Sequence, residues 1–468
     1  MSTINKVHKK LYIILAIAII IAALVAGFFI WYLSNSSSVS KTLTLGNEYL
    51  SDLNYDSAIK EYSKVLVVDP INEEALIGLV QSYTGQGNSQ MVDTLIRTSP
   101  ILASDTETLK KYASLLDEIG NYKQELEILD SLVAITDEDE FYEKKEEVLE
   151  KAMNQNYLFA SNEDHEACIS NGAVQTMGTN VLGALGTDKD IRIPTQTGTF
   201  SDAAFPGTAK SVFVTGSCTA VVDTNDTLWL AGSNRSGQKA TKNVELIAQS
   251  GWTEITSLTG VVKVAGTNGA TFALTKQGRL FMVGANDGFV YGNAWQDEWT
   301  EITGYGTISD IQCNGEFVAF LTSSGRIYGN TGYYYGNYSN MSKVWMTMVS
   351  DAQDFAMTDN CFIYSSSDGT ITDYYGTISF PSEWEVNDEY GYYLGYQAPY
   401  EIIDIATADN RAYLLDSDGI LHSIYEGKEN VVDQTGKIVS IYSSGNYCVA
   451  QFEDGSYQLY DVNGGLFT

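Results

Sequence analysis

A two-residue turn returns at a broad, regular interval through the last two-thirds of the chain. Each copy is a pair typical of tight hairpins and has β-type sequence on both sides. The seven pairs are Asn171-Gly172, Asn225-Asp226, Gln277-Gly278, Ser324-Gly325, Asp368-Gly369, Asp418-Gly419 and Asp454-Gly455. Units of about 50 residues with several short strands are typical of propeller blades. The seven turns therefore predict an all-β seven-bladed propeller over residues 156–468, whose last blade is expected to borrow a strand from residues before the first.

Short motifs inside these units resemble a known propeller family. A Gly-x-Asn element follows the hairpin at Gly178-Thr179-Asn180, Gly232-Ser233-Asn234 and Gly284-Ala285-Asn286. With Gly183-Ala184-Leu185-Gly186 and His165, these residues resemble the regulator of chromosome condensation family of seven-bladed propellers. The last three units lack the Gly-x-Asn element. The resemblance therefore implies the fold, and the nucleotide-exchange activity of that family is not extended to this chain.

A second repeat, with a period of about 34 residues, occupies residues 39–155. Asn54-Tyr55, Asn88-Ser89 and Asn121-Tyr122 are each expected to begin the second helix of a helical pair. This period resembles the tetratricopeptide repeat, whose small residues let paired helices approach closely. The sequence therefore predicts an all-α, tetratricopeptide-like solenoid with a capping helix at 141–154, which serves either to hold a partner or as a spacer.

The first 33 residues predict a membrane anchor. Residues 11–33 form an uncharged apolar run, long enough as a helix, at roughly 34 Å, to cross a bilayer. Lys6, Lys9 and Lys10 precede the run, which places residues 1–10 in the cytoplasm and everything after Ser34 outside it. The expected fold class is thus multidomain, with a single-pass transmembrane helix, a helical solenoid and a propeller at the cell membrane.

Charge and motif content argue against several classes of function. The chain has 59 acidic and 27 basic residues, a surface that repels nucleic acid. Five separated cysteines and three histidines predict no metal site or redox motif. Asp416-Ser417-Asp418-Gly419 resembles the start of a calcium loop but coincides with the sixth turn. No nucleophile elbow, phosphate loop or dinucleotide fingerprint is present, so we expect no catalytic residue and no cofactor.

Tyrosines provide the candidate binding site. Thirteen of the 31 tyrosines lie between Tyr328 and Tyr400. Adjacent tyrosines in Gly-broken loops cannot all point into a core, and an exposed tyrosine offers a large contact area at a small entropy cost. The alternative is that the rings only cover blade edges. The candidate partner-binding residues are Tyr333, Tyr334, Tyr335, Tyr374, Tyr375, Tyr390, Tyr392 and Tyr393.

These features favour binding over catalysis. The sequence predicts a membrane-anchored, extracytoplasmic interaction scaffold whose partner is a protein or a cell-surface glycan. One alternative is an extracellular carbohydrate-active enzyme, which would need two carboxylates about 5 to 10 Å apart in an aromatic-lined pocket. The other alternative is an accessory protein of envelope assembly or secretion, in which the helical repeats hold a client.

Overall fold

The computed structural model describes most of the chain after the apolar run. The described residues are 39–119, 121–153, 155–187, 196–240, 251–285, 295–314, 317–330, 345–358, 361–388 and 390–467. By its internal contacts the chain divides into two compact units, residues 1–115 and 116–468. Each unit is described by itself below.

The first unit is helical. Residues 39–51 are helical, and they are followed by α2 (Tyr55–Val68), α3 (Glu73–Gly85), α4 (Ser89–Thr98), the short η1 (Leu102–Ser104) and α5 (Thr106–Ile119), which extends past the unit boundary. The core centres on Tyr62, which is fully buried and donates a hydrogen bond to Asn47 at 2.7 Å. A Cβ at Gly46 or Gly78 would lie within 2.8 Å of the Tyr62 ring, so these glycines make room for that side chain.

The predicted starts of the second helices are confirmed. Helix α2 begins at Tyr55, α4 at Ser89 and, in the second unit, α6 (Tyr122–Thr136) begins at Tyr122. The asparagine before each start accepts a hydrogen bond from a backbone N–H of the first turn, at 3.1 to 3.4 Å. Asparagine is favoured there because its side chain satisfies a donor that has no partner within the helix.

The predicted fold class is nevertheless wrong in its helical part. Only a few helices precede the propeller, ending with α7 (Asp139–Met153), and they do not form a large all-α solenoid. So short a segment does not show a tetratricopeptide module. No helix within the described ranges is long and apolar enough to cross a membrane. The predicted span at 11–33 and the tail at 1–10 lie outside those ranges.

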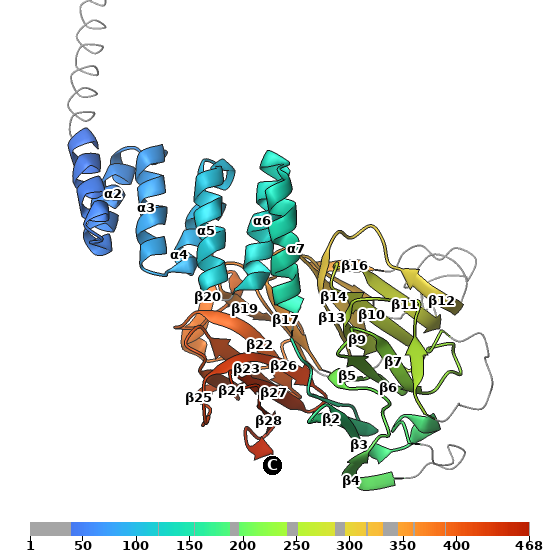
Figure 1. Cartoon of the computed structure of the whole chain (residues 1–468). Helices are drawn as coiled ribbons and strands as arrows, with labels where there is room; N and C mark the ends of the chain where they lie inside the picture. Colours follow the sequence, from blue (N-terminus) through green and yellow to red (C-terminus); the bar gives the residue numbers. More distant parts are fainter. Residues whose placement is uncertain are drawn as a thin grey trace, which may run out of the picture. The chain divides into compact units, whose positions relative to one another are not determined.

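The predicted seven-bladed propeller is confirmed, since the second unit contains seven antiparallel sheets (Figure 1). Blade 1 holds β1 (Phe159–Ser161), β2 (His165–Ser170), β3 (Ala173–Thr179) and β4 (Gln196–Asp202). Blade 2 holds β5 (Ala209–Val214), β6 (Cys218–Asp223), β7 (Leu228–Gly232) and β8 (Thr253–Ile255). Blade 3 holds β9 (Val261–Gly266), β10 (Ala270–Thr275), β11 (Leu280–Ala285) and β12 (Trp295–Glu301).

The other four blades complete the ring. Blade 4 holds β13 (Ile308–Cys313), β14 (Val318–Thr322), β15 (Ile327–Asn330) and β16 (Met346–Val349). Blade 5 has five strands, β17 (Asp354–Met357), β18 (Phe362–Ser365), β19 (Thr370–Asp373), β20 (Glu385–Asn387) and β21 (Tyr393–Gln397). Blade 6 holds β22 (Ile402–Ala408), β23 (Arg411–Asp416), β24 (Leu421–Tyr425) and β25 (Lys428–Val431). Blade 7 holds β26 (Ile438–Ser444), β27 (Tyr447–Phe452), β28 (Tyr457–Asp461) and β29 (Leu466–Phe467).

Each predicted turn joins the second and third strands of a blade. Six of them place a glycine at positive φ, and the seventh uses Asp226 at φ 58°. Glycine is favoured at these positions because it has no Cβ, so it adopts a positive φ without steric cost. The Gly-x-Asn element has a similar cause. A Cβ at Gly178 or Gly232 would lie within 2.5 Å of a backbone oxygen, and the asparagine two residues later accepts a backbone hydrogen bond from residue 185 or 239.

The ring closes without the shared strand that the sequence suggested. The first strands of the seven blades contact one another in an unbroken circle, and all four strands of blade 7 come from the C-terminal segment. Blade 1 meets blade 7 through side chains. The Tyr442 hydroxyl donates to the Phe159 carbonyl at 3.1 Å and accepts from the Leu158 and Phe159 N–H groups at 3.2 Å. Tyr442 therefore links the first and last blades by hydrogen bonds, as a shared strand does in other closed rings.

Candidate functional site

Blade 5 carries the predicted tyrosines that fall within the described residues. Tyr374 and Tyr375 directly follow β19, Tyr390 and Tyr392 lie between β20 and β21, and Tyr393 begins β21. Their side chains are exposed, from 46% for Tyr374 to 77% for Tyr390. Tyr333, Tyr334 and Tyr335 lie outside the described residues. We call Tyr374, Tyr375, Tyr390, Tyr392 and Tyr393 the tyrosine surface.

The five rings are not equivalent. Tyr374 and Tyr375 pack edge-on against each other at 5.4 Å and against Phe362 at 5.5 and 6.2 Å, so part of each ring covers the edge of the blade. Tyr390 and Tyr392 are 77% and 72% exposed. Tyr374 and Tyr375 therefore fit the interpretation that the rings cover the blade edge, and Tyr390 and Tyr392 have the exposure that partner binding would require.

An aspartate side chain forms hydrogen bonds with the backbone in both tyrosine loops. The Asp373 carboxylate accepts backbone hydrogen bonds from Tyr375 at 3.0 Å and from Ile378 at 2.5 Å. The Asp388 carboxylate accepts from Tyr390 at 2.9 Å and from Tyr392 at 2.7 Å. An aspartate that bonds to the backbone ahead of it fixes a turn. The tyrosines are thus held in place before any partner binds.

The strand register brings the two loops to the same end of the blade. Strands β19 and β21 are antiparallel, with Thr370 opposite Gln397 and Ile371 opposite Tyr396. The end of β19, which precedes Tyr374, and the start of β21 at Tyr393 therefore lie at the same end of the blade. Burial raises the pKa of Tyr393, and the neighbouring Tyr396 raises it further. This phenol therefore keeps its proton at neutral pH and can donate a hydrogen bond to a partner.

A second polar site, which the sequence reasoning missed, lies at the end of the propeller channel. Six of the seven first strands place a polar residue at one equivalent position, each followed by Val, Ile or Phe. These residues are Ser211, Lys263, Asp310, Asp354, Asp404 and Ser440. In five of the six strands the pairing with the second strand shifts register next to this residue. Such β-bulges re-aim side chains at the rims of barrels.

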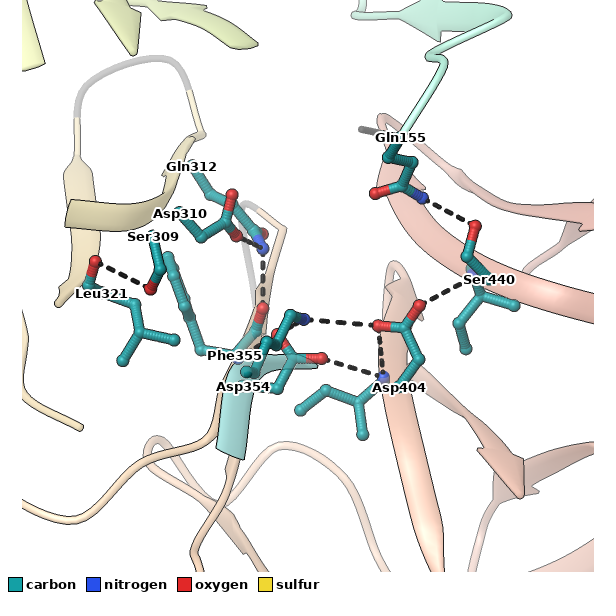
Figure 2. Close-up of polar contacts among 12 residues, drawn as sticks. Gln155, Ser309, Asp310, Gln312, Leu321, Asp354, Phe355, Asp404 and Ser440 are labelled. Atoms are coloured by element: carbon teal, nitrogen blue, oxygen red, sulfur yellow. Dashed lines mark hydrogen bonds and ion pairs between the residues drawn. The ribbon is translucent and has the colours of Figure 1, made fainter. Parts of the chain in front are cut away.

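Helix α6 supplies a cation to this ring. The amino group of Lys123 lies 2.5 Å from Asp354 Oδ1 and 3.6 Å from Asp404 Oδ1, while Lys263 pairs with Asp310 at 2.5 Å. Figure 2 shows Asp354 and Asp404 side by side, with Gln155 reaching Ser440 next to them. The helix α6 is thereby tied to blades 5 and 6.

The protonation states follow from burial and charge. Burial alone lowers the pKa of Lys123, but Asp354, Asp404 and Asp310 raise it by more, so Lys123 stays charged. Burial raises the pKa of Asp404, and the adjacent Asp354 raises it further, against the effect of Lys123. Asp354 also accepts backbone hydrogen bonds from Phe355 and Ile405, at 2.8 and 3.2 Å. Asp404 likewise accepts backbone hydrogen bonds, from Ile405 and Ile441 at 3.1 and 2.9 Å. Its raised pKa, caused chiefly by burial, favours the protonated form of Asp404.

This geometry indicates a structural role for the channel end. The cavity beside Lys123 has a volume of about 40 Å³, enough for water but far below the 300 Å³ or more of a typical ligand pocket. The cavity at Asp354 and Asp404 is therefore too small for a sugar ring, although Tyr157, Phe355 and Tyr442 are among its lining residues. An alignment of the seven blades on one another would have revealed the ring, whereas nothing local marks Lys123 as its partner.

The other sequence candidates have structural partners. His165 Nε2 lies 3.0 Å from the Thr219 hydroxyl, and burial lowers its pKa to about 4. In the calcium-like loop, Asp416 accepts from the backbone of Asp418 and Ile420 and lies 3.0 Å from His422 Nε2. Across the described ranges, no cluster of histidine, cysteine and acidic side chains is arranged to hold a metal ion. The five cysteines, all within the described residues, form no disulfide.

The comparisons with known proteins show weak structural similarities and no family. No protein-family model matches the chain, and no curated protein matches it. Human WBSCR16 is a similar solved structure, with 15% identity over 63% of this chain and 86% of its own, at a TM-score of 0.49. Prp20p from Saccharomyces cerevisiae is 13% identical over 62% of this chain and 81% of its own, at a TM-score of 0.45. Likenesses this weak carry no argument about function, and membership in the predicted family is not shown.

Proposed function

We propose that the chain is a protein-interaction scaffold that binds a protein partner through the tyrosine surface of blade 5, with no catalytic step. The observation that carries the proposal is the exposure of Tyr390 and Tyr392 at 77% and 72%. Their loop is already fixed by the Asp388 carboxylate. A backbone that is already ordered loses little entropy on binding, and a tyrosine side chain has few rotatable bonds to immobilise, so a large share of the contact energy goes into affinity.

The propeller supports this role because it is a rigid base for the loops. Tyrosine loops at the end of β19 and the start of β21 rest on a five-stranded sheet. Leu394, which is 55% exposed, adds apolar area beside them. Tyrosines around an apolar residue are typical of the centre of a binding surface. The location outside the cytoplasm at a cell membrane stays a prediction, as do the glycan partner and the secretion role.

Site-specific photo-cross-linking tests the proposal. A photoreactive phenylalanine analogue replaces Tyr392 in the full-length chain, expressed in the cells in which the chain is native. The control places the same analogue at Val431, which is 65% exposed on blade 6. We expect a discrete protein adduct from position 392 and none from position 431.

A second set of proteins shows whether the adduct depends on the surface. Changing Tyr374 and Tyr390 to Ser in the protein that carries the analogue at position 392 should remove the adduct without changing the melting temperature. The proposal is contradicted if the two positions give the same adducts, or if the adduct survives both substitutions.

A further inference from the structure

Blade 5 has an unusual charge. Residues 354–397 contain eight acidic residues and no Lys, Arg or His. The nearest basic residues along the chain are Lys343 and Arg411. Blade 3 offers a contrast, because residues 261–301 contain four acidic and three basic residues. Asp354 is paired with Lys123 of helix α6, and the other seven acidic residues of this blade segment have no basic residue within the segment.

Acidic groups flank the tyrosines on several sides. Asp373 and Asp388 start the two tyrosine loops. Both carboxylates are half-buried; Asp373 accepts backbone N–H groups and the Thr377 hydroxyl, and Asp388 accepts backbone N–H groups. Glu383 and Glu385 are exposed on the segment that leads into the second loop. The surface thus combines aromatic faces with carboxylates, which is the chemistry that holds a guanidinium group.

We infer that the partner segment that binds the tyrosine surface is basic and rich in arginine. The inference rests on the proposed function, since it names the chemistry of the partner for that same site. An arginine stacks on a tyrosine face with its apolar plane and pairs with a carboxylate at its edge, and a lysine makes only part of this contact. The negative field of blade 5 also attracts a basic segment before contact and repels an acidic one.

The chain makes such contacts within itself. Arg279 lies over the Phe281 ring at 4.9 Å while it pairs with Glu301 at 2.5 Å. Arg411 lies over the Tyr425 ring at 4.5 Å. The Arg279 contact is exposed, whereas Arg411 is buried and also donates to the Val462 carbonyl at 2.8 Å. Blade 5 offers rings and carboxylates of the same kind and has no arginine of its own to occupy them.

Binding of synthetic peptides to the purified full-length chain tests the inference. The three probes are peptides of equal length in which glycine alternates with arginine, with lysine or with glutamate. We expect the arginine peptide to bind most tightly, the lysine peptide several-fold more weakly, and the glutamate peptide not at all. Changing Tyr374, Tyr390 and Tyr392 to Ser should weaken arginine-peptide binding by about tenfold or more, at about 0.5–1 kcal/mol for each exposed ring contact.

Matched charge variants separate a local site from general attraction to an acidic protein. Glu383→Gln with Glu385→Gln removes two charges near the surface, and Glu163→Gln with Glu453→Gln removes two exposed charges on blades 1 and 7. We expect only the first pair to weaken binding. Equal effects of the two pairs, or arginine and lysine peptides that bind alike regardless of the tyrosines, would overturn the inference.

The two proposals can fail separately. A protein adduct at position 392, together with absent binding of the arginine peptide, overturns the basic partner and leaves the interaction scaffold standing. If the arginine peptide binds and reduces the protein adduct at position 392, both proposals are supported. The absence of both the adduct and peptide binding contradicts both.

Discussion

The channel end and the tyrosine surface use polar side chains in opposite ways. At the channel end, Lys123 and Asp354 meet within the protein at 2.5 Å, and their contact ties α6 to the propeller. On blade 5, the side chains of Tyr390 and Tyr392 are largely exposed to solvent. A buried charge that loses its partner destabilises the fold, whereas an exposed ring can be removed at little cost. We therefore expect substitutions at the first region to change stability and substitutions at the second to change binding.

Lys123→Met should have the largest effect on stability. It removes the cation and leaves the Asp354 carboxylate without its partner, which costs about 3 kcal/mol in a largely buried pair. Urea unfolding followed by tryptophan fluorescence measures this loss in the propeller, since six of the seven tryptophans lie between positions 229 and 384.

Lys428→Met, on the exposed part of β25, is the control for losing one positive charge. Adding Asp354→Asn to Lys123→Met should recover part of the stability, because the unpaired charge is then removed as well. If Lys123→Met costs no more than the control, the contact does not hold α6 on the propeller.

Tyr442→Phe should have the next largest effect. The substitution removes one donor and leaves the N–H groups of Leu158 and Phe159 without the acceptor that they share. Leaving buried donors unpaired costs about 2 kcal/mol. Tyr392→Phe also removes one hydroxyl, but from an exposed ring, and should leave the unfolding free energy unchanged. Similar losses for the two variants would contradict our account of how the ring closes.

The channel end should also respond to pH. The native state keeps a proton on Asp404, whose pKa burial and Asp354 raise, while the unfolded chain loses that proton at about pH 3.9. The folded state therefore binds more protons above that pH, and stability falls as pH rises towards the raised pKa. Asp404→Asn keeps a neutral group there and should flatten this fall. Urea midpoints across a pH series measure it, and identical slopes in both proteins would rule out the protonated Asp404.

The sequence predicted the tyrosine surface but not the channel end, for a physical reason. Exposed tyrosines in Gly-broken loops follow from local chain geometry, since neighbouring side chains such as Tyr374 and Tyr375 cannot all enter a core. The turn at each blade is equally local, because a residue at positive φ marks it, a glycine in six blades and Asp226 in blade 2. Lys123 and Asp354 are 231 residues apart, and their contact depends on how a helix end meets a closed ring.

The helical part shows the same limit. Asn54, Asn88 and Asn121 were predicted correctly as helix starts, because capping involves only the first turn. The prediction of a large solenoid was wrong, because a repeat period does not determine how many helices pack together or where a compact unit ends. The division between residues 115 and 116 falls inside α5, a position that no local signal in the sequence marks.

Asp388→Ala should have the smallest effect on stability and a measurable one on binding. It releases the backbone N–H groups of Tyr390 and Tyr392 to solvent, so the loop loses its fixed shape and binding must order it again. We expect arginine-peptide affinity to fall about threefold to tenfold, while the melting temperature stays close to that of the wild type. Asp388→Asn keeps a hydrogen-bond acceptor and should lose less of the affinity. If Asp388→Ala lowers the melting temperature and leaves the affinity unchanged, Asp388 has a role in the fold alone.

A thermal-shift experiment on three full-length proteins tests the central claim most directly, because a ligand that binds the native state raises its melting temperature. The proteins are the wild type, Lys123→Met, and the triple variant with Ser at positions 374, 390 and 392, each with and without the arginine peptide. We predict that the triple variant has the melting temperature of the wild type but shows no rise with the arginine peptide. Lys123→Met should have a lower melting temperature that still rises with the peptide. A triple variant that melts lower, or that keeps the shift, would contradict the account.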